Sequence, residues 1–177
     1  MKYIFLDIDG VLNSAEMNKE YIKSKKSNTP DDRFIENIID GKVVDYICVD
    51  LLRNLHDIVY KTNAKLIGVS SWFWFKDIEE YNFLFDKISQ ILSLPIRTTT
   101  EYTSGGIKRG AGVIKWLKEN NYNPEKDNFI ILDDCADFYS FKIKSIDGKV
   151  GLTKENVDYF INELNKLIGI DLKIMED

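Results

Sequence analysis

Cysteine and histidine are scarce in this sequence of 177 residues. The two cysteines, Cys48 and Cys135, lie far apart and match neither a disulfide scaffold nor the ligand spacing of a zinc site. Isolated cysteines suit a reducing compartment, so we predict a cytoplasmic protein. The single histidine, His56, lies off the apolar stripe of the helix expected around it, and we assign it to the solvated surface without a chemical role.

Long apolar runs and a surplus of basic residues are also absent from the sequence. No run approaches the roughly 18 apolar residues of a membrane span, and the N-terminus lacks the pattern of a signal peptide, so we expect no membrane partner. The net charge is −5 and the pI is about 5.0. This charge argues against tight non-specific binding of nucleic acid through a broad basic face, but it does not exclude a local basic site.

Apolar residues are plentiful, at 44% of the chain, which is enough for a folded core. At this length we predict one domain over residues 1–177. Its least regular part is a small insertion at about residues 14–47, with a polar loop at 23–32 between two short expected helices, 16–23 and 33–39. Basic residues of this insertion either contact a phosphodiester backbone or belong to a solvated surface; they are Lys23, Lys25, Lys26 and Arg33.

Strands and helices alternate along the rest of the chain. Apolar runs predict strands at residues 3–6, 65–69, 94–99, 128–134 and 141–146. Apolar residues at helical spacing predict helices around residues 49–62, 78–92, 113–117 and 157–168. The expected N-caps are Asp50, Asp77 and Thr153. This alternation predicts an α/β fold, a doubly wound and mainly parallel sheet with helices on both faces.

Polar residues follow three of the expected strands at the point where each strand ends. They are Asp7 and Asp9 after the first strand, Ser70 and Ser71 after the second, and Asp133 and Asp134 after the fourth. Because the carboxyl ends of parallel strands lie at one edge of a sheet, we expect these residues to converge on one pocket. Gly10 lets the chain turn sharply after Asp9, and a basic pair, Lys108 and Arg109, stands at the start of a helix.

Such a pocket has the chemistry to hold a divalent cation together with a phosphate group. Carboxylates are the oxygen ligands that hard cations prefer. A lysine and the cation offset the phosphate charge, while hydroxyl and backbone N–H groups bond its oxygens.

Four segments of the chain match, in order, the four motifs of the haloacid dehalogenase (HAD) superfamily. They are DIDGV at residues 7–11, the strand ending in Ser70, a Lys before a helix, and ILDD at residues 131–134. The resemblance covers about residues 1–150. In addition, SSW at 70–72 and GIKRGAGVIKWL at 106–117 resemble the small phosphatase-like domains of RNA-repair proteins.

The resemblance implies a role for each matching residue. Asp7 would be the nucleophile that forms an aspartyl-phosphate, and Asp9 would act as general acid and then as general base. Ser70 would hydrogen-bond the phosphoryl group, with Ser71 and Gly10 beside it. Lys108 would neutralise the phosphate; either it or Arg109 fills this role, because the helix register is uncertain by a residue. Mg²⁺ would be bound by Asp7, the backbone carbonyl of Asp9, and Asp134, with Asp133 as a ligand or a supporting group.

We therefore expect a Mg²⁺-dependent phosphomonoesterase. The substrate is either a nucleic-acid 3′-phosphate end or a small phosphorylated metabolite such as a nucleotide, and the short insertion resembles minimally capped members, whose open sites admit large substrates. An alternative of another class is a receiver-like phospho-switch or a catalytically dead phosphate-binding module. Receivers carry their phospho-acceptor Asp on the third strand, whereas the expected third strand here ends in threonines, which argues against a receiver.

Overall fold

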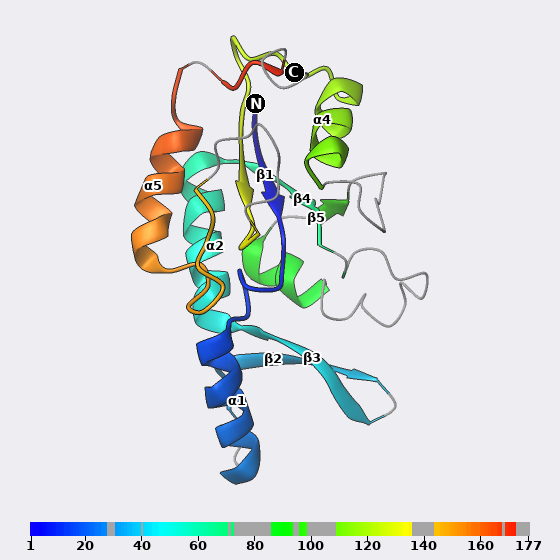
Figure 1. The fold of residues 1–177 in the computed structure, drawn as a ribbon, viewed down its shortest axis with the longest axis vertical. Coiled ribbons are helices and arrows are strands. Elements are labelled where there is room, and N and C mark those ends of the chain that lie inside the picture. The colour runs from blue at the N-terminus through cyan, green and yellow to red at the C-terminus, as the bar shows by residue number, and fades with distance from the viewer. Residues whose placement is uncertain are drawn as a thin grey trace.

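A four-stranded parallel sheet forms the centre of the protein (Figure 1). The computed structural model describes residues 1–27, 31–39, 41–70, 72, 86–93, 96–98, 109–135, 144–167 and 169–172. Across the sheet the strands are β5 (Ile96–Thr98), β4 (Lys65–Gly68), β1 (Lys2–Leu6) and β6 (Asn128–Leu132). These strands confirm the predictions at 3–6, 65–69 and 128–134 and the described part of the one at 94–99, and they place the first strand between two neighbours.

Helices cover both faces of this sheet, as the α/β prediction requires. Helices α2 (Val49–Thr62) and α5 (Lys154–Leu164) lie on one face, and α4 (Arg109–Glu119) lies on the other (Figure 1). Side chains of β1 alternate between the two faces, because successive residues of a strand point in opposite directions.

The central strand is therefore buried on both sides. Ile4 and Leu6 join the cluster beneath α2 and α5, while Phe5 packs with an edge-to-face ring contact on Trp116 of α4. Burying each such side chain stabilises the fold by about 1.5–3 kcal/mol. This burial holds the residue that follows β1, Asp7, at a defined position in the sheet.

Helix α2 buries the apolar stripe that the sequence predicts, but its first turn differs from the expectation. The N-cap residue is Cys48, not Asp50. Asp50 lies inside the first turn, where its negative charge interacts favourably with the positive end of the helix dipole. It also accepts a hydrogen bond from Arg53 at 3.0 Å. The helix ends as predicted at Asn63, whose φ of 54° is left-handed and whose N–H donates to the Val59 carbonyl.

Helix α5 begins with the cap that the sequence predicts, Thr153. Asn156 completes the cap, since its Oδ1 accepts from the Thr153 N–H at 3.0 Å and from the Thr153 hydroxyl at 2.8 Å. Val157, Phe160 and Leu164 are buried against the core, as expected from their spacing.

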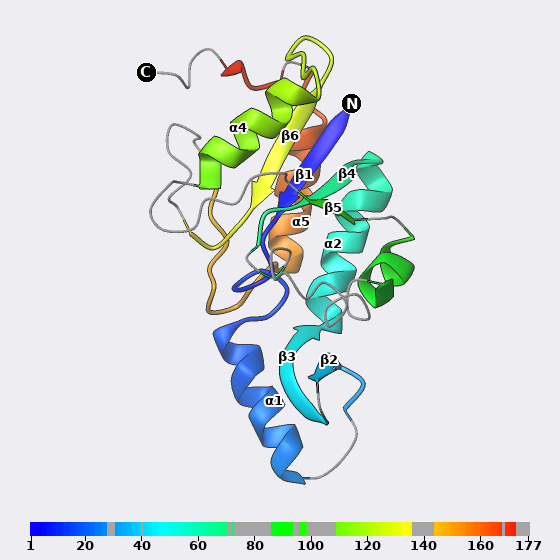
Figure 2. The same ribbon diagram turned by 90° about the vertical axis from the view of Figure 1, so that its right-hand side faces the viewer.

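The insertion is more regular than predicted. It consists of helix α1 (Ala15–Ser27) and an antiparallel hairpin of β2 (Phe34–Ile39) and β3 (Lys42–Cys48). The helix expected at 33–39 is wrong, because this segment pairs with β3 and its three isoleucines suit a strand. The loop expected at 23–32 is also wrong in its first part, since α1 continues to Ser27. The insertion lies beyond the carboxyl end of the sheet, at the bottom of Figures 1 and 2.

Two further predictions fall partly outside the described residues. The helix expected at 78–92 is described over residues 86–92, and its expected cap, Asp77, lies outside the described residues. The strand expected at 141–146 is absent from its described part, residues 144–146, although the Ile146 N–H donates to the Asp133 carbonyl. Within the described segments, no helix combines the length and the apolar character that crossing a membrane requires.

Candidate active site

Two carboxylates come together because β1 and β6 are parallel and in register. Leu6 lies opposite Leu132, and the Asp7 N–H donates to the Leu132 carbonyl at 2.9 Å, so the pairing continues one residue beyond each strand. Asp7 and Asp133 therefore occupy equivalent positions just after two neighbouring strands, where parallel pairing directs their side chains to the same face of the sheet.

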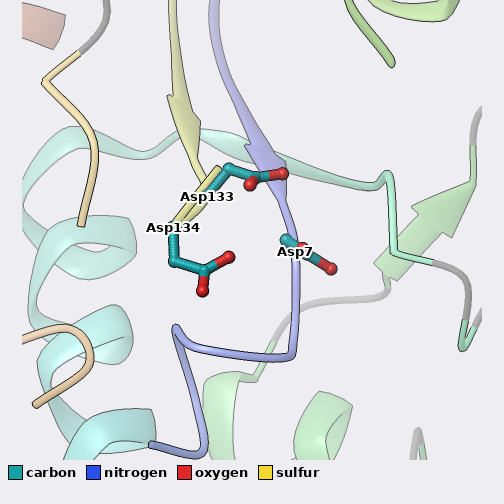
Figure 3. Close-up of side chains that lie close together, drawn as sticks. All are labelled: Asp7, Asp133 and Asp134. Atoms are coloured by element: carbon teal, nitrogen blue, oxygen red, sulfur yellow. The ribbon is translucent and has the colours of Figure 1, made fainter. Parts of the chain in front are cut away.

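A third carboxylate, from Asp134, completes an acidic cluster with Asp7 and Asp133. One oxygen of each lies within 4.8 Å of the others (Figure 3). Asp7 is 2% exposed and Asp133 is fully buried, whereas Asp134 is exposed. Bringing carboxylates this close is unfavourable unless positive charge offsets their repulsion. Three carboxylates from adjacent segments are a donor set that suits a hard divalent cation such as Mg²⁺.

Asp134 is held in a narrow slot between two glycines. A Cβ atom added at Gly10 would lie 2.2 Å from Oδ2 of Asp134, and one added at Gly148 would lie 2.4 Å from the same atom. Gly10 also has a φ of +70°, which side-chain-bearing residues rarely adopt. The two glycines thus let the backbone approach the carboxylate closely.

Asp9 points to a different set of partners. Its Oδ2 accepts a hydrogen bond from the Trp72 indole N–H at 2.9 Å, and its Oδ1 accepts one from the Asn13 side-chain amide at 3.0 Å. The other end of the Asn13 amide accepts from the Gly10 N–H at 3.0 Å. Asp9 itself is exposed, so its carboxylate is accessible from solvent.

Ser70 lies at the end of β4, the strand beside β1. Sheet pairing continues past β4, because the Val69 N–H donates to the Leu6 carbonyl at 2.9 Å. Ser70 is fully buried, and its hydroxyl oxygen accepts from the Trp72 backbone N–H at 3.3 Å. Trp72 therefore contacts both Ser70 and Asp9.

The structure describes less of the expected phosphate-binding half of the site. Ser71 and Lys108 lie outside the described residues. Arg109 is the first residue of α4, but only its backbone is described. The choice between Lys108 and Arg109 as the expected phosphate-binding residue therefore remains a prediction.

The insertion lies at the same edge of the sheet as the site. Burial is the main reason that the pKa of Tyr46, on β3, is raised to about 12, and the Asp9 carboxylate adds to the rise. Two of the four basic residues singled out in the insertion are engaged by acids: Lys25 pairs with Glu36, and Arg33 pairs with Asp31 at 2.7 Å.

Sequence reasoning missed three residues that shape the site, Asn13, Trp72 and Gly148. Asn13 follows Asp9 by four residues, a spacing that becomes a contact only once the chain turns at Gly10. Trp72 lies in the SSW segment, and no local pattern reveals that its indole reaches a residue 63 positions away. Gly148 likewise carries no local signal that it borders Asp134.

The sheet and its acidic edge define an α/β domain of the HAD type. A family model described as "HAD domain in Swiss Army Knife RNA repair proteins" matches residues 3–157. The chain belongs to this family, which confirms the resemblance seen in the motifs and indicates a hydrolase of the phosphatase type. No curated protein and no solved structure matches the chain.

Proposed function

We propose that the protein is a Mg²⁺-dependent phosphomonoesterase that removes the 3′-phosphate from a nucleic-acid end. The observation that carries the proposal is the buried Asp7 beside the carboxylates of Asp133 and Asp134, with a second acid, Asp9, two residues further along the chain. The pair Asp7 and Asp9 supplies a nucleophile and a proton-transfer group at one strand end.

Mg²⁺ would be held by the carboxylates of Asp7, Asp133 and Asp134 and by the backbone carbonyl of Asp9. The bound cation would offset the charge of the phosphoryl oxygens. The slot formed by Gly10 and Gly148 supports this assignment, because it leaves little room around the Asp134 carboxylate, one oxygen of which lies within 4.8 Å of oxygens of its two neighbours.

In the first chemical step, a carboxylate oxygen of Asp7 attacks phosphorus. The new bond gives an aspartyl-phosphate, and the bond from phosphorus to the ester oxygen breaks. Asp9 donates its proton to that oxygen, so the substrate leaves as an alcohol. Ile8 helps to orient the nucleophile, because its N–H donates to Oδ1 of Asp7 at 2.8 Å.

In the second step, water attacks phosphorus while the bond to Asp7 breaks. Asp9, now a carboxylate, takes the proton from water and returns to its starting form. The products are the alcohol and inorganic phosphate, and Asp7 is regenerated as a carboxylate. Ser70 and a basic residue at the start of α4 would bond the phosphoryl oxygens in both steps.

The choice of a nucleic-acid end is supported by the family, whose description places its HAD domain in RNA repair proteins. The net charge of −5 favours recognition of the phosphorylated end over binding along a broad basic surface. The same active-site chemistry would also serve a nucleotide, so the substrate must be decided by assay.

The test compares purified protein on four substrates with Mg²⁺ and with EDTA. They are a 3′-phosphorylated oligoribonucleotide, the same oligonucleotide with a 5′-phosphate, a panel of nucleoside monophosphates, and p-nitrophenyl phosphate. We expect Mg²⁺-dependent release of phosphate, fastest from the 3′ end. Preference for nucleoside monophosphates would show that the substrate is a nucleotide and not a nucleic-acid end. Inactivity on all four substrates would overturn the enzyme assignment.

A further inference from the structure

The Asp9 carboxylate is exposed, yet each of its oxygens accepts a hydrogen bond from a donor that is itself held in place. Trp72 is 5% exposed, and its indole N–H donates at 2.9 Å. Asn13 donates at 3.0 Å and is fixed by the Gly10 N–H at its other end. A short carboxylate side chain at the surface otherwise samples several rotamers, and two fixed donors select one of them.

Trp72 also contacts the residue expected to bond the phosphoryl group. Its backbone N–H donates to the hydroxyl oxygen of Ser70 at 3.3 Å, while its indole N–H donates to Asp9. Because the Ser70 oxygen acts as acceptor here, its O–H remains a donor for another group. A single buried residue thus sets the separation between the hydroxyl at the end of β4 and the carboxylate after β1.

We propose that Trp72 is a positioning residue for proton transfer, which holds the Asp9 carboxylate toward the leaving group, with Asn13 as the second donor. The inference rests on the proposed phosphomonoesterase function and adds to it the group that orients Asp9. Indole N–H is a donor only, and the packed ring has little freedom to turn, so this contact has one geometry. Loss of the donor frees Asp9 without removing its carboxyl group.

The decisive variant is Trp72→Phe, which keeps an aromatic ring in the core and removes only the N–H donor and part of the ring. Its matched control is Trp116→Phe, which makes the same change at another buried tryptophan, on α4. The paired substrates are phenyl phosphate and p-nitrophenyl phosphate. They have similar shapes, but p-nitrophenolate is a much more stable anion and needs little protonation as it leaves.

We expect Trp72→Phe to lower kcat for phenyl phosphate about tenfold, the effect of losing one hydrogen bond to a charged group. For p-nitrophenyl phosphate the loss should be less than about threefold, because that step depends little on proton donation. KM should stay the same for both. Equal losses on the two substrates would mean that Trp72 acts only through packing, and no loss on either would also overturn the inference.

A second measurement is independent of activity. The chain has three tryptophans, so its indole N–H signals are readily resolved by NMR, and Trp72→Phe identifies the one from Trp72. In Asp9→Ala we expect this signal to move upfield and to exchange faster with solvent, while the Trp116 signal stays in place. An unchanged Trp72 signal would overturn the contact. Inactive wild-type protein with a shifted signal would instead disprove the phosphatase function on which the positioning role depends, and with it that role.

Discussion

Asp7 is held in a defined position by its surroundings. It follows the central strand, is 2% exposed, and is bonded through its backbone to the end of β6. Its carboxylate lies in the acidic cluster and accepts from the Ile8 N–H. These contacts set both its place and its orientation, which suits the proposed role of nucleophile.

Asp7→Asn should lower kcat at least a thousandfold, because the amide cannot form the aspartyl-phosphate. The fold should be retained, and the melting temperature should stay the same or rise, since one of three clustered negative charges is removed. Steady-state phosphate release and thermal unfolding measure the two effects. Asp158→Asn, at an exposed position of α5, is the control and should behave as wild type. Turnover retained in Asp7→Asn would exclude Asp7 as the nucleophile.

The slot around Asp134 gives a second prediction for single residues. In Gly148→Ala the new methyl group meets the flexible end of Asp134, so the carboxylate moves and the fold survives. We expect the Mg²⁺ concentration for half-maximal activity to rise about tenfold, which corresponds to about 1.4 kcal/mol of binding free energy. A magnesium titration of activity measures this change.

Gly10→Ala provides the comparison for this slot. It meets the same carboxylate but also forces a side chain into a φ of +70°, so it should in addition lose about 1–2 kcal/mol of unfolding free energy. Urea unfolding of both variants separates the two costs. Wild-type magnesium dependence in Gly148→Ala would contradict the placement of Asp134 as a ligand.

At the scale of elements, α2 and α5 are joined by polar contacts as well as by the core. The Lys154 ammonium pairs with the Asp57 carboxylate, and the Asn54 amide donates to the Leu152 carbonyl at 2.7 Å. The hydrogen bond from Lys154 is the main reason that the pKa of Asp57 lies below its ordinary value. Both side chains of the pair are substantially exposed, so the pair is worth little in water.

Asp57→Asn should cost about 0.5 kcal/mol of unfolding free energy at pH 7 and low salt. A carboxyl group whose pKa is lowered by folding stabilises the protein above its unfolded pKa of about 4, and this contribution is lost as pH falls through the lower folded value. The difference between wild type and Asp57→Asn should therefore shrink as the pH falls below about 4, and it should also shrink in 1 M salt. Urea unfolding across this range measures it. A difference that persists in acid would assign the effect to packing.

The hairpin β2–β3 shows where sequence patterns mislead at the scale of elements. Phe34, Ile35, Ile38 and Ile39 recur at spacings of one and three, which fit one helical face as well as a strand. The segment becomes a strand because β3 pairs with it, with a register shift between Asn37 and Ile38. The local pattern carries no information about a partner strand, and for this reason the helix prediction was wrong.

At the scale of the whole molecule, the proposed cation site joins the ends of two adjacent strands. The cluster links the segment after β1 to the segment after β6 (Figure 3). A ligand that binds only the folded protein raises its stability by mass action, by about 2.7 kcal/mol at a hundred times its dissociation constant. Cation binding at the proposed site would therefore be coupled to folding.

Mg²⁺ should raise the melting temperature of the whole protein in a saturable manner. Asp134→Asn should reduce this response strongly, because it removes the charge of one of three clustered carboxylates. Differential scanning fluorimetry over a magnesium titration measures the shift, with KCl at matched ionic strength as the control. An equal shift with KCl would attribute the effect to charge screening instead of a bound cation.

Much of the fold and the three clustered acids of the candidate site follow from local patterns. The apolar runs locate four of the described strands, and the stripe of α2 and the Thr153 cap of α5 locate two helices. The polar residues after β1 and β6 identify the carboxylates, because parallel strands end at a common edge. The assignments of Lys108 and Ser71 stay predictions, since both residues lie outside the part of the chain that the structure describes.

The sequence by itself determined the α/β order and the three acids at the sheet edge, because strand and helix periods are local and parallel pairing is regular. Only the tertiary structure decided that Trp72 holds Asp9, that Gly148 borders Asp134 and that the insertion contains a hairpin. Each of these depends on how connecting segments bring distant residues into contact. That outcome is set by packing of the whole chain, and no local pattern contains it.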